Sequence, residues 1–203
     1  MESIRKLIQS LSIFLMNGFW GFPVTRNIYQ GPLKVVCSPG LNCYSCPAAT
    51  TYCPLGSLQQ LLLGIRFSLE TGGFFIGTYV IGSMGILGAV FGRLICGWAC
   101  PFGLFQELLH KIPSPKYPVP ARLRWGKYVF LALFVVILPL VAVDDFGLGV
   151  PWFCKYVCPA GTLEAGIPML LLQPELRSTI GLIFWNKIVI MAGFILWSIV
   201  SSR

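Results

Sequence analysis

Long apolar stretches alternate along the chain with short polar segments rich in proline and glycine. Four of these stretches are long, and they cover residues 7–24, 72–94, 127–143 and 182–200. Each approaches the roughly 20 residues that a helix needs to cross a bilayer. The second stretch also spaces Gly73 with Gly77 and Gly88 with Gly92, a pattern that lets helices approach closely. The pattern predicts an all-α membrane protein with about four transmembrane helices.

Three shorter apolar pieces each follow a Cys-Pro pair. They are "LGSLQQLLLGI", "FGLFQELLHKI" and "AGTLEAGIPMLLL". All three are too short to span, so we expect half-helices or helices at the membrane interface. Glu107 and Glu164 fall within these pieces, and we expect both on helix surfaces.

Composition agrees with a membrane protein. Of the 203 residues, 56% are hydrophobic and 11% are charged, whereas soluble domains carry about 25% charged residues. We therefore treat residues 1–203 as a single membrane domain. No phosphate-binding or dinucleotide-binding loop, nucleic-acid signature or catalytic dyad is present, so we expect no nucleic acid among its partners.

The formal charge of +8 is unevenly distributed. With four spans, the two termini and the loop between the second and third spans share one side, and that side carries most of the positive charge. The positive-inside rule then places both termini in the cytoplasm. We expect a multi-pass protein of the inner (cytoplasmic) membrane of a prokaryotic cell. The basic segment "KIPSPKYPVPARLRWGK" also fits the docking of an acidic redox partner.

Eight cysteines lie in three loops, at residues 37–56, 96–103 and 154–161. Three segments share the pattern Cys-Pro-x-Gly-x-(Leu/Phe)-(Gln/Glu), beginning at Cys53, Cys100 and Cys158. The second and third copies have another cysteine four residues earlier. The first copy has Ala49 at that position, and its nearest cysteines are Cys43 and Cys46.

This arrangement suits a metal cluster. Proline fits the first helical position, which places the preceding cysteine at the helix N-terminus, where free N–H groups and the helix dipole favour a thiolate. Iron–sulfur clusters are held by four cysteines. Zinc, disulfides and buried free thiols are the alternatives, but three copies of one motif favour iron–sulfur. The candidate ligands are Cys37, Cys43, Cys46, Cys53, Cys96, Cys100, Cys154 and Cys158.

The cysteine segments resemble the NapH/NosR-type polytopic membrane ferredoxins. The matching pieces are "GPLKVVCSPGLNCYSCPAATTYCPLGSLQ", "CGWACPFGLFQELLHKIP", "VPARLRWGKYV" and "FCKYVCPAGTLEAGIP". The resemblance implies 4Fe-4S clusters, of which eight cysteines would complete two. It also implies electron transfer with membrane donors and acceptors such as quinols, ferredoxins or flavin-bearing modules.

One departure from the family pattern affects ligand assignment. The family has a further Cys-x-x-x-Cys-Pro-x-Gly after its last span, where this sequence ends in "SIVSSR". On the charge-derived topology, Cys96 and Cys100 would then lie alone on the cytoplasmic side. We expect either a truncated chain or ligands from a partner subunit. Alternatively, the half-helices re-enter the bilayer and bring all eight cysteines together.

On the outer side we group Cys46 and Cys53 with Cys154 and Cys158, by analogy with the repeat. The two remaining outer cysteines, Cys37 and Cys43, would contribute ligands, form a disulfide or bind a second cluster.

The sequence therefore favours a membrane electron-transfer subunit of an oxidoreductase complex over a stand-alone enzyme. Its expected partners are the lipid bilayer, a ferredoxin or flavin-bearing subunit, and a quinone. Two alternatives remain open: a membrane protein that reduces or senses during the assembly of another redox enzyme, and a metal-free scaffold stapled by disulfides.

Overall fold

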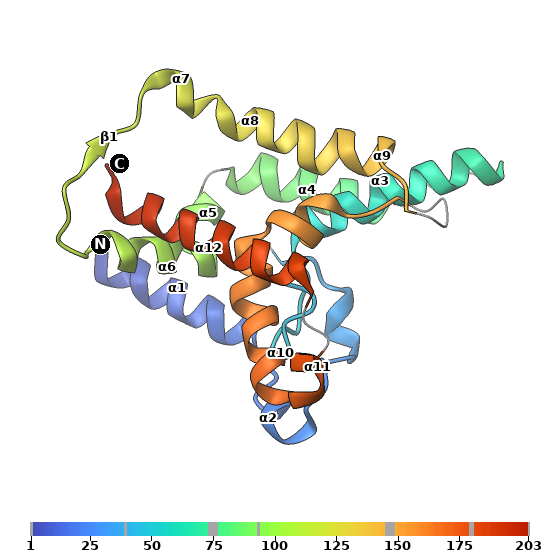
Figure 1. Ribbon diagram of the computed structural model, residues 1–203, viewed down its shortest axis with the longest axis horizontal. Helices are drawn as coiled ribbons and strands as arrows, with labels where there is room; N and C mark the ends of the chain where they lie inside the picture. The colour runs from blue at the N-terminus through green and yellow to red at the C-terminus, as the bar shows by residue number, and fades with distance from the viewer. Residues whose placement is uncertain are drawn as a thin grey trace.

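The protein is built almost entirely of helices and loops, as predicted. The computed structural model describes residues 2–38, 40–72, 77–92, 94–144, 149–178 and 181–202. Its longer helices are α1 (Glu2–Met16), α3 (Pro54–Thr71), α4 (Thr78–Phe91), α6 (Pro101–His110) and α12 (Leu182–Val200) (Figure 1). One further helical run comprises α7 (Ala121–Arg124), α8 (Gly126–Phe130), the π-helical η2 (Leu131–Ile137) and α9 (Leu138–Val141).

Shorter elements connect these helices. They are α2 (Phe22–Thr25), the 3₁₀-helical η1 (Pro32–Val35), α5 (Leu94–Trp98), the π-helical η3 (Phe153–Val157) and η4 (Gly161–Gly166), α10 (Ile167–Leu172) and α11 (Pro174–Ser178). Strands β1 (Tyr117–Pro118) and β2 (Ser201–Ser202) pair in parallel. This pairing ties the segment after α6 to the end of α12, near the end of the molecule where the N-terminus also lies (Figure 1).

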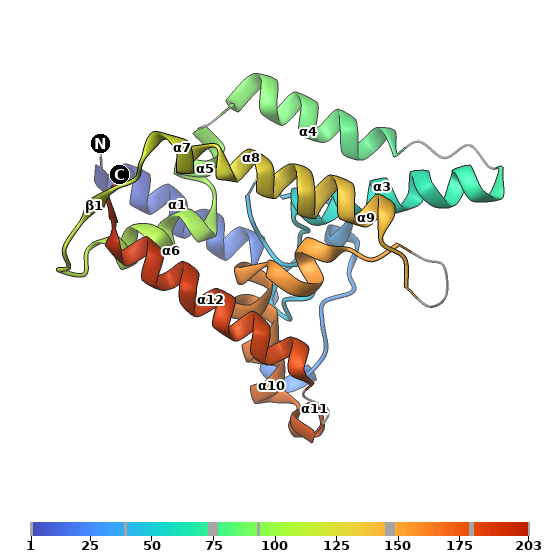
Figure 2. The ribbon, with the colours of Figure 1, turned by 45° about the horizontal axis from the view of Figure 1, so that its top comes forward.

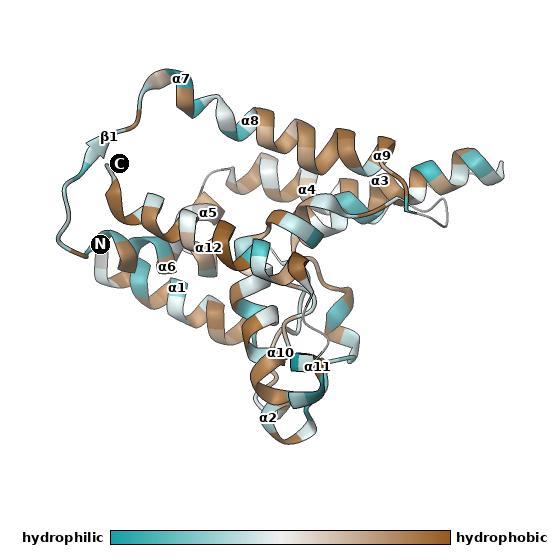
Figure 3. Cartoon of the chain, in the orientation of Figure 1, coloured by the Kyte–Doolittle hydropathy of each residue, from teal (hydrophilic) through white to brown (hydrophobic). Residues whose placement is uncertain are grey.

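Among the described residues, two helical runs are long and apolar enough to cross a membrane. They are Ala121–Val141 (21 residues) and Leu182–Val200 (19 residues), in the places of the third and fourth predicted spans. Both are predominantly apolar along their length (Figure 3), and their side chains are largely exposed. Exposed apolar surface of this extent is typical of helices that face lipid or a partner.

The first predicted span is not one continuous helix. Helix α1 ends at Met16, and α2 covers only four residues beyond the break. Loop contacts account for the ending, since the Phe19 N–H donates to the Ala48 carbonyl at 3.1 Å. Gln9 is fully buried, and its side-chain amide donates to the Gly97 carbonyl at 2.7 Å. Helix α1 therefore packs against α5 and α6.

The second predicted span coincides in part with α4. Residues 73–76 and 93 lie outside the described residues, so the Gly73–Gly77 pair is not tested. At the other end, the Gly92 N–H donates to the Gly88 carbonyl at 3.0 Å, and Gly92 has a φ of 50°. Gly92 therefore ends the helix. No described atom lies within 4 Å of a Cβ added to Gly88, so nothing described packs closely there.

The Cys-Pro pairs begin helices, as predicted. Cys53 is the N-cap of α3 and Cys100 that of α6, with a proline at the first helical position of each. After Cys158 the chain is helical from Pro159 onward. Helix α6 has about the predicted length, whereas α3 extends to 18 residues. Helix α3 packs against α4, η2 and α9, while α6 packs against α1 and α12 (Figure 2).

Candidate functional site: a four-cysteine cavity

Two of the three Cys-Pro repeats face one cavity. It has a volume of about 660 Å³ and lies between the loop that precedes α3 and the segment η3–η4. Cys43 and Cys53 line it from the first side, and Cys154 and Cys158 line it from the second. The rest of the wall is mostly apolar and includes Leu41, Leu55, Leu61, Val80 and Phe153. The fold thus brings four cysteines, distant in sequence, to one site.

The last residue of the repeat connects the two sides reciprocally. In the first copy this residue is Gln59, whose Oε1 accepts a hydrogen bond from the Cys154 N–H at 3.4 Å. In the third copy it is Glu164, whose Oε2 accepts one from the Cys43 N–H at 2.9 Å. Each copy therefore holds the main chain of a cysteine contributed by the other. In this exchange Cys43 corresponds to Cys154.

The repeat glycines leave room for the cysteine side chains in the same reciprocal way. A Cβ on Gly56 would lie 3.9 Å from Cys154 Sγ. A Cβ on Gly161 would lie 3.6 Å from Cys43 Sγ and 3.7 Å from Cys158 Sγ. A larger side chain at either position would enter the space between the sulfurs. The glycine of the Cys-Pro-x-Gly motif thus keeps space free beside the cavity sulfurs.

Main-chain N–H groups approach the sulfurs at the helix starts. The Gly161 N–H lies 3.3 Å from Cys158 Sγ. Burial raises the pKa of Cys53, and the main-chain amides of Gly56 and Leu55 act in the opposite direction. Hydrogen bonds of this kind stabilise thiolates and tune the potential of iron–sulfur clusters.

Burial and mutual repulsion keep these thiols protonated when no metal is bound. Burial, followed by the charges of Cys53 and Cys43, raises the pKa of Cys154 to about 12. Burial also raises the pKa of Cys158 to about 12 and that of Cys43 to about 11. Several buried thiolates side by side would be costly unless cations compensated them. Metal binding at this site therefore has to displace protons.

The donor set suits an iron–sulfur cluster. Within the described residues, no group of three His, Cys, Asp or Glu side chains is arranged to hold a single metal ion. A 4Fe-4S cluster is held by four cysteines that surround a core of several atoms. Four cysteines around a cavity, with glycines that leave it open, match that requirement.

The predicted grouping placed Cys46 with Cys53, Cys154 and Cys158. In the structure, the fourth cysteine at the cavity is Cys43. Cys43 lines the cavity, whereas Cys46 does not. The buried Cys46 thiol instead points to Asn17 Oδ1 at 3.8 Å. The difference arises because the first copy lacks the Cys-x-x-x-Cys spacing, so its loop decides which cysteine faces the cavity.

Cys100 is not isolated from the cysteines of the first loop. The Leu41 N–H donates to Cys100 Sγ at 3.4 Å. A Cβ on Gly40 would come within 2.9 Å of Cys100 Cα, so a glycine is needed for this close approach. Cys100 thus lies close to the first cysteine loop, whereas the charge-derived topology placed the two on opposite sides of the membrane.

The remaining cysteines lie outside the cavity or outside the description. Cys37 is buried and forms a parallel bridge with Tyr52. Cys96 belongs to α5, but its side chain is outside the described residues. The cysteines whose side chains are described are all free thiols: Cys37, Cys43, Cys46, Cys53, Cys100, Cys154 and Cys158.

Three polar residues at the site were not identified as such from the sequence. Glu164 was expected on a helix surface, but it holds the Cys43 main chain, and burial raises its pKa to about 7. Gln59 is fully buried, and its Nε2 also donates to the Phe134 carbonyl at 3.1 Å. Gln59 and Glu164 could have been identified from the sequence, because both occupy the Gln/Glu position at the end of the repeat. Lys34, which is buried beside the first loop, belongs to no repeated pattern.

Comparisons with known proteins agree with this chemistry. The family model of a 4Fe-4S binding domain matches residues 73–120 and 128–169. These ranges contain Cys96, Cys100, Cys154 and Cys158, while the first cysteine loop lies outside them. The match supports 4Fe-4S cluster binding and an iron–sulfur electron-transfer role.

Two uncharacterized proteins of Methanocaldococcus jannaschii are similar in sequence. One is 27% identical over 150 residues, which cover 54% of this chain and 61% of the relative. The other is 35% identical over 83 residues, which cover 38% of this chain and 34% of the relative. The chain thus matches less than two thirds of the length of each. No solved structure matches.

Proposed function

We propose that this protein is a membrane electron-transfer protein that holds a 4Fe-4S cluster on Cys43, Cys53, Cys154 and Cys158. The observation that carries the proposal is the reciprocal construction of the cavity. Gln59 and Glu164 each hold the main chain of a cysteine from the other repeat. Two cysteines on each side of one cavity supply the four sulfurs that a cubic 4Fe-4S cluster needs.

The chain's own residues would position and shield the cluster. A bound cluster supplies the capacity to accept and release single electrons. The Gly161 N–H at the start of η4 points at the Cys158 sulfur, where it favours the anionic form. The apolar wall, including Leu61 and Phe153, limits access of water. No proton-transfer or group-transfer step is required of the site.

A second cluster accounts for the remaining cysteines, Cys37, Cys46, Cys96 and Cys100. The contact between the Leu41 N–H and Cys100 Sγ supports a site shared by the first and second loops. Eight cysteines would then serve two clusters within one chain. Electrons could pass from one cluster to the other across the loop that contributes ligands to both.

The proposed setting is the inner membrane of a prokaryotic cell, with four transmembrane helices and both termini in the cytoplasm. The two long apolar runs support membrane insertion. Helices α1 and α4, with 15 and 14 residues, are shorter than a full span, but both expose apolar side chains that suit contact with lipid. These include Leu7, Leu11 and Phe14 of α1, and Ile81, Ile86 and Val90 of α4.

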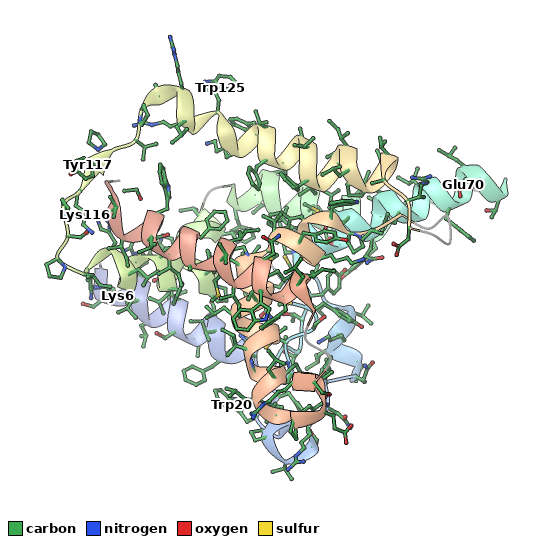
Figure 4. The ribbon with its side chains drawn as sticks, viewed as in Figure 1. Lys6, Trp20, Glu70, Lys116, Tyr117 and Trp125 are labelled. Atoms are coloured by element: carbon green, nitrogen blue, oxygen red, sulfur yellow. The ribbon has the colours of Figure 1, made fainter. Side chains whose placement is uncertain are left out.

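The proposed protein partner is an acidic redox protein, such as a ferredoxin or a flavin-bearing subunit. No acidic residue occurs between Glu107 and Asp144, whereas Lys111, Arg122, Arg124 and Lys127 are all exposed there. Lys116 and Lys6 lie toward the end of the molecule where both termini are found (Figure 4). Helix α6 leads from this end directly to Cys100. A quinone remains a further proposed electron donor or acceptor.

The decisive experiment is anaerobic purification in detergent, followed by assays for iron and acid-labile sulfide and by EPR of the reduced protein. We expect eight iron atoms and eight sulfides per chain if both clusters form, and four of each if only the cavity is filled. Protein that is folded but free of iron after reconstitution would contradict the proposal and leave the disulfide scaffold. A loaded protein that no ferredoxin or quinol reduces would favour a role in assembly of another enzyme.

A further inference from the structure

Lys34 is a buried lysine next to the first cysteine loop. It lies in η1, and its exposed fraction is only 8%. Its Nζ donates to the Ala49 carbonyl at 2.8 Å and lies 4.6 Å from the centre of the Tyr44 ring. A carbonyl and an aromatic face stabilise an ammonium group, but neither carries a net negative charge. A buried ammonium costs several kcal/mol unless an anion compensates it.

Within the described residues, no carboxylate is paired with this charge. Ion pairs recorded there, such as those of Arg5 with Glu107 and Arg66 with Glu70, do not include Lys34. Burial lowers the pKa of Lys34, and the charges that act in the opposite direction are those of Cys46 and Cys43. Both are proposed cluster ligands, and Cys46 is itself only 6% exposed. The Lys34 ammonium, which has no carboxylate partner among the described residues, thus lies near the sulfurs of Cys46 and Cys43.

We propose that Lys34 is the counter-charge of the second iron–sulfur cluster, the one that Cys46 of the Cys43–Cys46 segment would bind, and that it raises the reduction potential of that cluster. This inference rests on the proposed function, since it assumes that the segment binds a cluster. Lys34 would act as a positioning and tuning residue, because its ammonium reaches the ligand segment and is not itself assigned as a ligand.

The sign of the effect follows from charge. Reduction adds one electron to the cluster and therefore one negative charge. A fixed cation nearby stabilises the reduced form more than the oxidised form. In a water-poor surrounding this interaction is weakly screened. Removing the charge at position 34 should therefore make the cluster harder to reduce.

The first test compares neutral and charged variants of the loaded protein. Lys34→Gln keeps a donor for the Ala49 carbonyl but loses the charge, whereas Lys34→Arg keeps the charge. Lys127→Gln is a matched control, because the Lys127 ammonium lies 4.9 Å from the Tyr128 ring but on an exposed helix. EPR-monitored redox titration gives the midpoint potential, and iron and sulfide assays give the loading.

We expect a more negative midpoint potential in Lys34→Gln and potentials close to wild type in Lys34→Arg and Lys127→Gln. A folded Lys34→Gln that loses iron while Lys34→Arg keeps it also supports the inference. An unchanged potential in fully loaded Lys34→Gln overturns it. Absence of iron from the wild type would instead refute the proposed function, so the two failures are distinguishable.

The second test uses the apoprotein and needs no loaded variant. Without a cluster, the buried ammonium has no counter-charge, so neutralising it should leave stability unchanged or raise it. We therefore expect the melting temperature of apo Lys34→Gln to equal or exceed that of the apo wild type. A clearly lower melting temperature would show that Lys34 has its essential partner within the polypeptide, and the inference would fail.

Discussion

Gln59 and Glu164 occupy the same position in two copies of one repeat, and each accepts a hydrogen bond from the main chain of a cysteine in the opposite segment. The Gln59 bond to the Cys154 N–H measures 3.4 Å, and the Glu164 bond to the Cys43 N–H measures 2.9 Å. The acceptor from one copy of the repeat thus holds the cysteine segment next to the other copy. These two hydrogen bonds position Cys43 and Cys154, which both line the cavity.

The cysteine grouping can be tested with two matched substitutions. Cys43→Ser should remove the cavity cluster, because it takes away one of four ligands. Cys46→Ser should leave that cluster's EPR signal in place, since the Cys46 thiol points to Asn17. Iron content and EPR of both variants provide the measurement. Loss of the same signal in both variants, or only in Cys46→Ser, would contradict the grouping.

The two acceptor side chains should matter for stability as well as for loading. Replacing Glu164 or Gln59 with leucine leaves a partly buried N–H without a partner, which costs about 1–3 kcal/mol. Glu164→Gln keeps an acceptor oxygen and should cost less. Denaturant unfolding of the apoproteins, monitored by circular dichroism, tests this order. Equal losses for Glu164→Gln and Glu164→Leu would argue against the hydrogen bond as the cause.

The repeat glycines should be required for cluster binding more than for folding. Gly161→Val would place methyl groups among the sulfurs of Cys43 and Cys158, whose Sγ atoms lie within 3.7 Å of the new Cβ. We expect a folded protein with little iron. Gly85→Val is the control, because nothing described lies within 4 Å of a Cβ there. Normal iron loading of Gly161→Val would show that the cluster lies elsewhere.

The apoprotein should lose stability in alkali. The folded-state pKa of Cys154 is about 12, above the ordinary value of 9.0. A raised pKa contributes stability that is complete below about pH 9 and is lost as the pH rises toward 12. In the loaded protein these thiolates are bound to iron and no longer titrate. Melting temperatures from pH 7 to 11 should therefore fall more steeply for apoprotein, and parallel curves would refute this.

The exposed basic residues from the end of α6 into α8, which include Lys111, Arg122, Arg124 and Lys127, should govern association with an acidic redox partner. Arg122→Gln combined with Arg124→Gln removes two exposed charges, so reduction by an acidic ferredoxin probe should slow and depend less on salt. The cluster spectrum should not change, since these residues lie far along the chain from the cavity. Arg177→Gln serves as the control because Arg177 is exposed on α11. Stopped-flow reduction rates at two ionic strengths decide the question, and equal rates in all variants would exclude this docking surface.

The sequence predicted several helix starts and helix bounds correctly. The Cys-Pro pairs at Cys53 and Cys100 predicted helix starts, because proline tolerates the first helical position and ends the preceding loop. The apolar run 182–200 predicted a helix with the same bounds as α12. The first predicted span was less accurate, because the hydropathy of residues 7–24 did not reveal two main-chain hydrogen bonds at the end of α1. The Phe19 N–H donates to the Ala48 carbonyl, and the Thr50 N–H donates to the Met16 carbonyl.

What the sequence by itself determined was the kind of chain: repeated helix starts after Cys-Pro pairs, a mostly helical, apolar chain, and cysteine spacing that predicts an iron–sulfur cluster. These features depend on residue type and short spacing. Only the tertiary structure decided that Cys43 faces the cavity in place of Cys46, that Cys100 meets the Leu41 N–H, and that Lys34 is buried beside the ligand loop. Those relationships depend on loop paths and on contacts between segments far apart in the chain, which no local pattern of residues encodes.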